Sequence, residues 1–182
     1  MRRARWIVVG GCTGLLLAGG PVLAKEGAAD PGTQRAGDDR EFLRQALGVN
    51  ALELELGRLA AARSSTPELR AKAQKMVENH TKIDRQLRDV AHQAGLSGEP
   101  VLSAEQNKTL ARVKAQPASD FDTVFKQTVD SGHVEELAMY RNEVSRTANP
   151  QLRALAEQRV TALEQAVSGA KQPAGGMGSG GR

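Results

Sequence analysis

Residues 67–95 read PELRAKAQKMVENHTKIDRQLRDVAHQAG, and this stretch decides the fold class. Its apolar residues recur every three or four positions, which is the spacing of one face of an α-helix. Thr66 suits the N-cap, Pro67 the first turn and Gly95 the end of this helix. The apolar stripe consists of Leu69, Ala73, Met76, Ile83, Leu87 and Ala91. His80 interrupts that stripe at its centre, so the same stretch also supplies the first candidate for chemistry.

The helical spacing continues on both sides of this stretch. We expect three further long helices, at 38–63 behind Asp38 or Asp39, at 120–147, and at 150–167 behind Asn149-Pro150. A shorter helix is expected at 103–114, where Ser103 and Gln106 are spaced as a capping box. The pattern predicts an all-α fold, an antiparallel four-helix bundle with the short extra helix in a long crossover between its second and third helices. A single long crossover of this kind is found in ferritin-like bundles.

The two ends of the chain differ from the helical part in composition. Arg2, Arg3 and Arg5 precede an apolar run that ends at Ala24, which is the pattern of an export signal. Glycines interrupt the run, and it is shorter than the roughly 20 residues of a membrane anchor. We expect a periplasmic protein, with lipid attachment through Cys12 as the alternative. The predicted parts are a signal peptide at 1–24, a flexible leader at 25–37, the bundle domain at 38–168 and a disordered glycine-rich tail at 169–182.

Removal of the signal peptide changes the charge of the protein. Three of the 25 basic residues and none of the 21 acidic ones would be lost, so the net charge falls from +4 to +1. Aromatic residues make up 3% of the chain, too few for base stacking on single-stranded nucleic acid. The only cysteine would also be removed. We therefore expect no nucleic-acid partner and no thiol chemistry, and no motif indicates a small organic cofactor.

Polar residues interrupt the apolar stripes on three of the long helices. Glu53 lies on the first, His80 on the second, and His133 and Glu136 on the third. A carboxylate in a core is costly unless it is paired, hydrogen-bonded or bound to metal, and helical bundles build metal sites from such side chains. Asp84, one turn after His80, is a further ligand or orients the imidazole. A divalent metal ion is the cofactor that these residues would hold.

The same residues also fit a structural role, as a buried Glu–His polar cluster that fixes the register of the helices. The spacing is not that of a di-iron centre, because the last long helix contains no histidine. Arg159, on the core face of that helix, needs a carboxylate partner such as Glu53 or Glu136. A salt bridge with either carboxylate would compete with metal binding. His92 lies beyond the apolar stripe and is expected in solvent.

Three short stretches together resemble a known family. They are Glu53-Leu54-Glu55-Leu56-Gly57, Met76-Val77-Glu78-Asn79-His80-Thr81, and Phe121-Asp122 followed by His133. The chain resembles the exported bacterial domain-of-unknown-function 4142 family, whose members are often called predicted outer membrane proteins and are classed as ferritin-like. The resemblance implies a ferritin-like bundle in the envelope and no established reaction. Members commonly carry a histidine in the last helix where this chain has Ala166, which implies a lost ligand and an open position.

Taken together, we expect an exported ferritin-like bundle that is not an enzyme and that binds a divalent metal. The tentative ligands are Glu53, His80 and His133, with Glu136 and Asp84 as helpers. The alternative is a structural or protein-interaction module of the cell envelope, in which these residues form only a polar cluster. A metal-dependent enzyme ranks behind both because no complete ligand set is visible. The envelope partner and the oligomeric state stay open.

Overall fold

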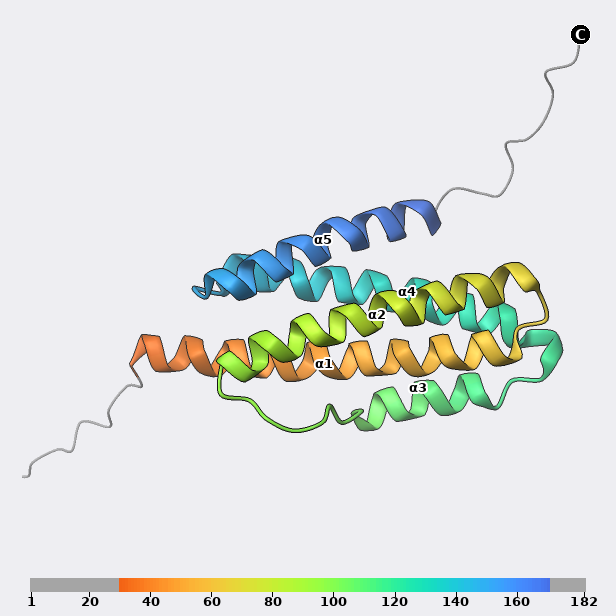
Figure 1. Ribbon diagram of the computed structural model, residues 1–182, viewed down its shortest axis with the longest axis horizontal. Helices are drawn as coiled ribbons and strands as arrows, with labels where there is room; N and C mark the ends of the chain where they lie inside the picture. The colour runs from red at the N-terminus through yellow and green to blue at the C-terminus, as the bar shows by residue number, and fades with distance from the viewer. Residues whose placement is uncertain (1–29, 171–182) are drawn as a thin grey trace, which may run out of the picture.

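The computed structural model describes residues 30–170, which form an all-α protein of five helices (Figure 1). The helices are α1 (Pro31–Arg63), α2 (Pro67–Gln93), α3 (Ala104–Lys114), α4 (Ala118–Arg146) and α5 (Pro150–Ala170). No strand occurs within residues 30–170, so the all-α part of the prediction is confirmed. The predicted signal peptide lies outside the described residues. Within them, no helix is both long enough and apolar enough to span a membrane.

The outer limits of the helical part differ from the prediction at both ends. Helix α1 begins at Pro31 rather than at Asp38, so residues 31–37 are helical and do not belong to a leader. The reason is an earlier cap, because the side chain of Asp30 accepts a hydrogen bond from the amide of Gly32. At the other end, α5 continues to Ala170 and includes Gly169, which we had placed in the tail. The rest of the predicted tail, 171–182, lies outside the described residues.

The internal helix ends follow the capping signals of the sequence. The Thr66 side chain accepts from the amide of Leu69 at the start of α2. Ser103 and Gln106 form both hydrogen bonds of a capping box at the start of α3. Gly95 follows α2 with a φ of 77°, a conformation that glycine adopts without strain.

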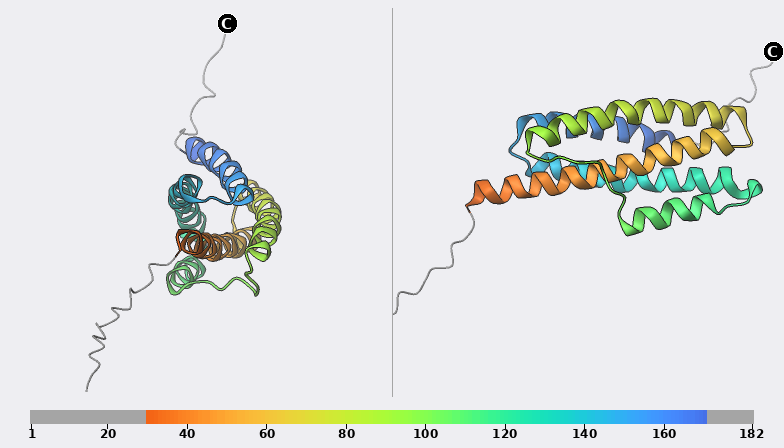
Figure 2. Two further views of the ribbon diagram at one scale, coloured as in Figure 1. Left: turned by 90° about the vertical axis from the view of Figure 1, so that its left-hand side faces the viewer. Right: turned by 60° about the horizontal axis from the view of Figure 1, so that its bottom comes forward.

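The long helices form two antiparallel hairpins, α1 with α2 and α4 with α5 (Figure 1). Arg63 at the end of α1 donates to the carbonyl oxygens of Lys114 and Gln116, just before α4. At the opposite end, Arg146 of α4 pairs with Asp38 of α1 at 3.1 Å. Helix α4 therefore runs antiparallel to α1. The connection from α2 to α4 must cross the length of the molecule, and α3 lies in it against α1 and α4 (Figure 2).

Two apolar core clusters fill the helical bundle, one toward each end. The first core cluster holds Phe42, Leu43, Ala46, Leu47, Ile83, Leu87, Val90, Ala91, Leu137, Tyr140, Leu152, Leu155, Ala156 and Leu163. The second core cluster holds Leu56, Ala60, Leu69, Ala73, Leu110, Val113, Phe121 and Phe125. Helix α5 contributes only to the first cluster and α3 only to the second. A polar layer of six residues from four helices interrupts the apolar core: Asn50, Glu53, His80, His133, Glu136 and Arg159. On α1, α2 and α4 these residues lie between the members of the first and second clusters along the sequence.

Candidate metal centre

Three helices bring Glu53, His80 and His133 together in the polar layer. One ligand atom from each of these side chains lies within 4.8 Å of the other two. Glu53 Oε2 is 3.1 Å from His80 Nδ1, and Glu53 Oε1 is 3.4 Å from His133 Nε2. A tetrahedral ion about 2.1 Å from each ligand would hold ligand atoms about 3.4 Å apart. The 3.4 Å between Glu53 Oε1 and His133 Nε2 already matches this spacing, and His80 would have to turn a free ring nitrogen toward the ion.

Asn50 fixes the orientation of the His80 ring. Its Nδ2 donates to the carbonyl oxygen of His80 over 3.1 Å, so its Oδ1 must be the atom that faces His80 Nδ1 at 2.9 Å. That oxygen can only accept, and His80 Nδ1 therefore carries the proton. The other ring nitrogen, Nε2, keeps its lone pair. A hydrogen bond to one nitrogen that leaves the other free is the usual arrangement of a metal-binding histidine.

The carboxyl group of Glu53 is buried and incompletely paired. Its Oε2 forms no hydrogen bond with any described residue, because the nearby Nδ1 of His80 is directed to Asn50 instead. Burial, and then the charge of Glu136, raises the pKa of Glu53 well above its ordinary value despite the opposing charge of Arg159. Burial therefore favours the uncharged form of this carboxyl group.

Both histidines are uncharged in the same environment. Burial lowers the pKa of His80 to about 3, and the positive charge of Arg159 adds to this effect. Burial also lowers the pKa of His133, although Glu136 acts in the opposite direction. Metal binding needs ionised Glu53 and uncharged imidazoles, so a bound cation would shift Glu53 toward its charged form.

Glu136 lies beside the triad, in an ion pair with Arg159. Arg159 Nη2 donates to Glu136 Oε1 over 2.7 Å, and only 3% of the Glu136 side chain is exposed. The arginine thus pairs with Glu136 and leaves Glu53 available. Asp84 lies outside the group, because its Oδ2 accepts from Arg88 over 2.7 Å. His92 is exposed at the end of α2.

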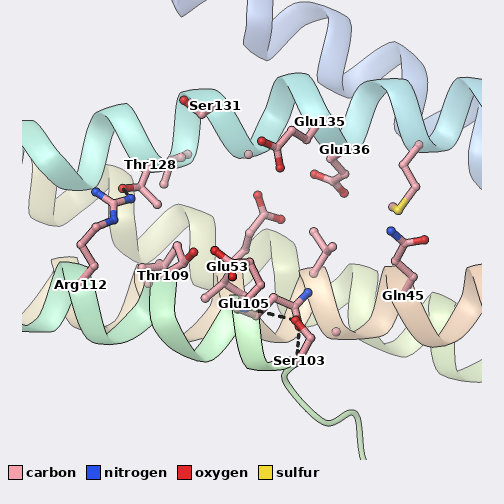
Figure 3. A pocket seen from close by; sticks show the side chains of 18 of the residues that line it. Gln45, Glu53, Ser103, Glu105, Thr109, Arg112, Thr128, Ser131, Glu135 and Glu136 are labelled. Carbon is pink, nitrogen blue, oxygen red and sulfur yellow. Dashed lines mark hydrogen bonds between the residues drawn. The ribbon is translucent and has the colours of Figure 1, made fainter.

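A large cavity reaches the polar layer from the side of α1, α3 and α4. It has a volume of about 750 Å³, and we call it the acidic cavity because five glutamates and two arginines line it. Figure 3 shows Glu135 and Glu136 on its α4 wall, facing the wall formed by α1 and α3. The charged residues of the lining are Glu41, Arg44, Glu53, Glu105, Arg112, Glu135 and Glu136.

A second, smaller pocket reaches the triad from the opposite pair of helices. It has a volume of about 340 Å³, and we call it the α2–α5 pocket. Its lining consists of Lys72, Lys75, Met76, Asn79, His80, Ile83, His133, Arg159, Ala162, Leu163 and Ala166. Both histidines of the triad therefore line this pocket, where α5 contributes two alanines beside Arg159 and Leu163.

A family model for a domain of unknown function, DUF4142, matches residues 24–172, which is most of the chain. The chain belongs to the DUF4142 family. Comparison with curated proteins and with solved structures gave no match. Membership in DUF4142 confirms the resemblance seen in the sequence, and it carries no assigned reaction.

In this DUF4142 chain, Ala166 stands where the resemblance implies a histidine. The structure places Ala166 in the lining of the α2–α5 pocket, together with His80 and His133. A side chain at position 166 would thus share a pocket with two members of the triad. The alanine leaves that position without a ligand from α5.

Sequence reasoning missed one member of the polar layer of this DUF4142 protein. Asn50 is 2% exposed and holds His80 by two contacts. A signal was present, since Asn50 lies three residues before Glu53 and therefore on the same face of α1. A polar side chain one turn from a buried carboxylate could have been assigned to the same cluster.

Proposed function

We propose that this DUF4142 protein is an exported ferritin-like four-helix bundle that binds one divalent transition-metal ion through Glu53, His80 and His133. The observation that carries the proposal is the buried carboxyl group of Glu53, whose Oε2 has no hydrogen-bond partner among the described residues and whose two oxygens face His80 and His133. A buried polar atom without a partner is costly. Two histidines and one glutamate form a known ligand set for zinc.

The course of the chain supports the ferritin-like part of this proposal. Four long helices form two antiparallel hairpins, and the one long connection joins α2 to α4. Ferritin-like bundles have a single long crossover of this kind. The basic and apolar pattern of residues 1–24 supports export, with a lipid anchor at Cys12 as the alternative destination.

The fourth long helix supports a single ion rather than a pair. A di-iron bundle takes carboxylate and histidine ligands from all four helices. Here α5 contributes Arg159, whose guanidinium lies against Glu136. A fixed positive charge at this place opposes a second metal ion through charge repulsion.

The test is the metal content of protein purified without chelators or an affinity tag. Wild-type protein should carry close to one equivalent of metal, and His80→Ala and His133→Ala should each lose it. His92→Ala is the matched control, because His92 is an exposed histidine on the same helix as His80. Absence of metal in the wild type, with no thermal shift on adding iron, zinc, copper or manganese, would refute the proposal.

The polar layer also has contacts that are complete without metal, and these favour a second candidate function. Asn50 satisfies both the ring and the backbone of His80, and Arg159 satisfies one oxygen of Glu136. In this alternative the layer fixes helix register in an interaction module of the cell envelope. His80→Ala would then destabilise the protein equally with and without added metal, and no metal would copurify.

A further inference from the structure

The α2–α5 pocket carries charge of one sign. Its charged lining residues are Lys72, Lys75 and Arg159, and no acidic residue lines it. Neither lysine forms an ion pair with another residue of 30–170. The acidic cavity on the other side of the polar layer has the opposite balance. The triad is therefore approached by a negative surface on one side and by a positive one on the other.

The charges of the loaded centre do not cancel. A divalent ion and ionised Glu53 together leave one positive charge, while Glu136 and Arg159 neutralise each other in their ion pair. The side chains of Glu53 and Glu136 are 6% and 3% exposed, so water screens this charge poorly. An uncompensated charge in such a place is costly, and one bound anion would balance it.

The geometry leaves room for that anion on the metal itself. Three protein ligands occupy three positions of a tetrahedral ion, and a fourth remains for a ligand from solution. Helix α5 supplies no ligand, because its part of the pocket wall consists of Arg159, Ala162, Leu163 and Ala166. The pocket volume of about 340 Å³ is roughly ten times that of one water molecule, which is ample for a small anion with its water.

We propose that the α2–α5 pocket admits a small inorganic anion, which takes the fourth position on the metal held by Glu53, His80 and His133. Lys72 and Lys75 attract the anion at the mouth of the pocket, and the space left by Ala166 lets it reach the ion. This inference rests on the proposed metal function. It adds the class of the exogenous ligand and the side from which that ligand arrives.

The experiment uses the protein loaded with Co²⁺, whose visible absorption reports on its ligands, and azide as the probe anion. Azide should change the spectrum in a saturable way. The double variant Lys72→Gln/Lys75→Gln should weaken azide binding roughly three- to tenfold, as expected for two partly screened charges. Ala166→Leu should fill the pocket and abolish the azide response while the cobalt spectrum without azide is kept. The matched controls, Lys82→Gln on α2 and Ala154→Leu on α5, change exposed residues outside the pocket and should bind azide as the wild type does.

Each outcome decides a different statement. If cobalt does not bind, the proposed function fails, and the anion site fails with it. If cobalt binds but azide leaves the spectrum unchanged, the metal site stands and the anion inference is overturned. The inference is also overturned if Ala166→Leu responds to azide like the wild type, because the anion would then reach the metal by another path.

Discussion

Helices α4 and α5 are joined by two arginine–glutamate pairs that differ in burial and not in geometry. Arg159–Glu136 and Arg141–Glu164 both have a nitrogen–oxygen distance of 2.7 Å. The side chains of the first pair are 10% and 3% exposed, and those of the second are 57% and 47% exposed. Replacing each arginine by methionine removes the same interaction from two environments.

The expected costs differ several-fold. Arg159→Met leaves a buried carboxylate without its counter-charge, and such changes cost about 3–5 kcal/mol. Arg141→Met leaves its former partner, Glu164, in contact with water, so the loss in the free energy of unfolding should be about 1 kcal/mol or less. The double variant Arg159→Met/Glu136→Leu should recover most of the stability lost in the single variant, because no charge then remains in the core.

Urea unfolding followed by circular dichroism, with chelator present, measures these differences. The reasoning is refuted if Arg159→Met costs no more than Arg141→Met. It is also refuted if the double variant is less stable than Arg159→Met alone.

Three further variants test other parts of the structure. A Cβ atom at Gly57 would lie 2.9 Å from Val77 Cγ2. Gly57→Ala should therefore destabilise the protein by about 1 kcal/mol, even after the gain in helix propensity. Adding Val77→Ala should restore the lost stability. Burial and a hydrogen bond with Asp39 raise the pKa of Glu143 from 4.5 to about 7. Between about pH 4.5 and pH 7 the folded protein therefore keeps a proton that the unfolded chain loses. As the pH rises through this range, the free energy of unfolding should fall by about 1–2 kcal/mol after allowance for screening. The variant Glu143→Gln should lack this decline. Glu53→Gln exchanges a carboxyl group of raised pKa for an amide of equal size, so the free energy of unfolding of chelator-treated protein should change by less than about 1 kcal/mol. In the wild type, Zn²⁺ at a hundredfold excess over Kd should stabilise the fold by about 2.7 kcal/mol and raise Tm. In Glu53→Gln this rise in Tm should disappear.

Opposite results would locate the error in each case. Gly132→Ala is the control for helix propensity, because a Cβ atom there meets nothing within 4 Å, and it should stabilise by roughly 0.5–1 kcal/mol. If Gly57→Ala behaves in the same way, α1 and α2 are not in close contact at this point. A Glu143→Gln protein with the wild-type pH dependence would assign the decline to another group. A loss of several kcal/mol in chelator-treated Glu53→Gln would show that the carboxylate is ionised and structural.

Most of the fold was predictable because local signals agree with the apolar spacing. Thr66, Ser103 and Gly95 mark helix ends by chemistry that acts within one turn. The start of α1 was missed although the same chemistry marks it, since Asp30 precedes Pro31 and Gly32. Glycines at 32 and 37 had favoured a leader there, and their low helix propensity was not decisive once the first turn was capped.

The sequence could predict which residues form the candidate site, but not which side chains pair with each other. The spacing placed Glu53, His80 and His133 on interior faces, and the structure brings them together. Spacing along one helix cannot show which neighbour a long side chain chooses across the bundle. Arg159 was assigned to either of two carboxylates, and Asp84 to the site, whereas the structure pairs Arg159 with Glu136 and Asp84 with Arg88. The two pockets depend on side chains from three or more helices and had no signal in the sequence.

The unequal share of α5 in the core has a consequence for motion. Every residue that α5 buries lies between Leu152 and Leu163, and its last two turns bury none. Segments with few buried contacts open locally at much lower free energy than the whole fold. Ala166, in those turns, forms part of the wall of the α2–α5 pocket. Transient unwinding of the end of α5 would widen this pocket and release only the partly buried Val167 from the first core cluster. Ligand exchange at the centre should then be limited by the rate of this local opening, which hydrogen exchange of the amides at 164–170 reports.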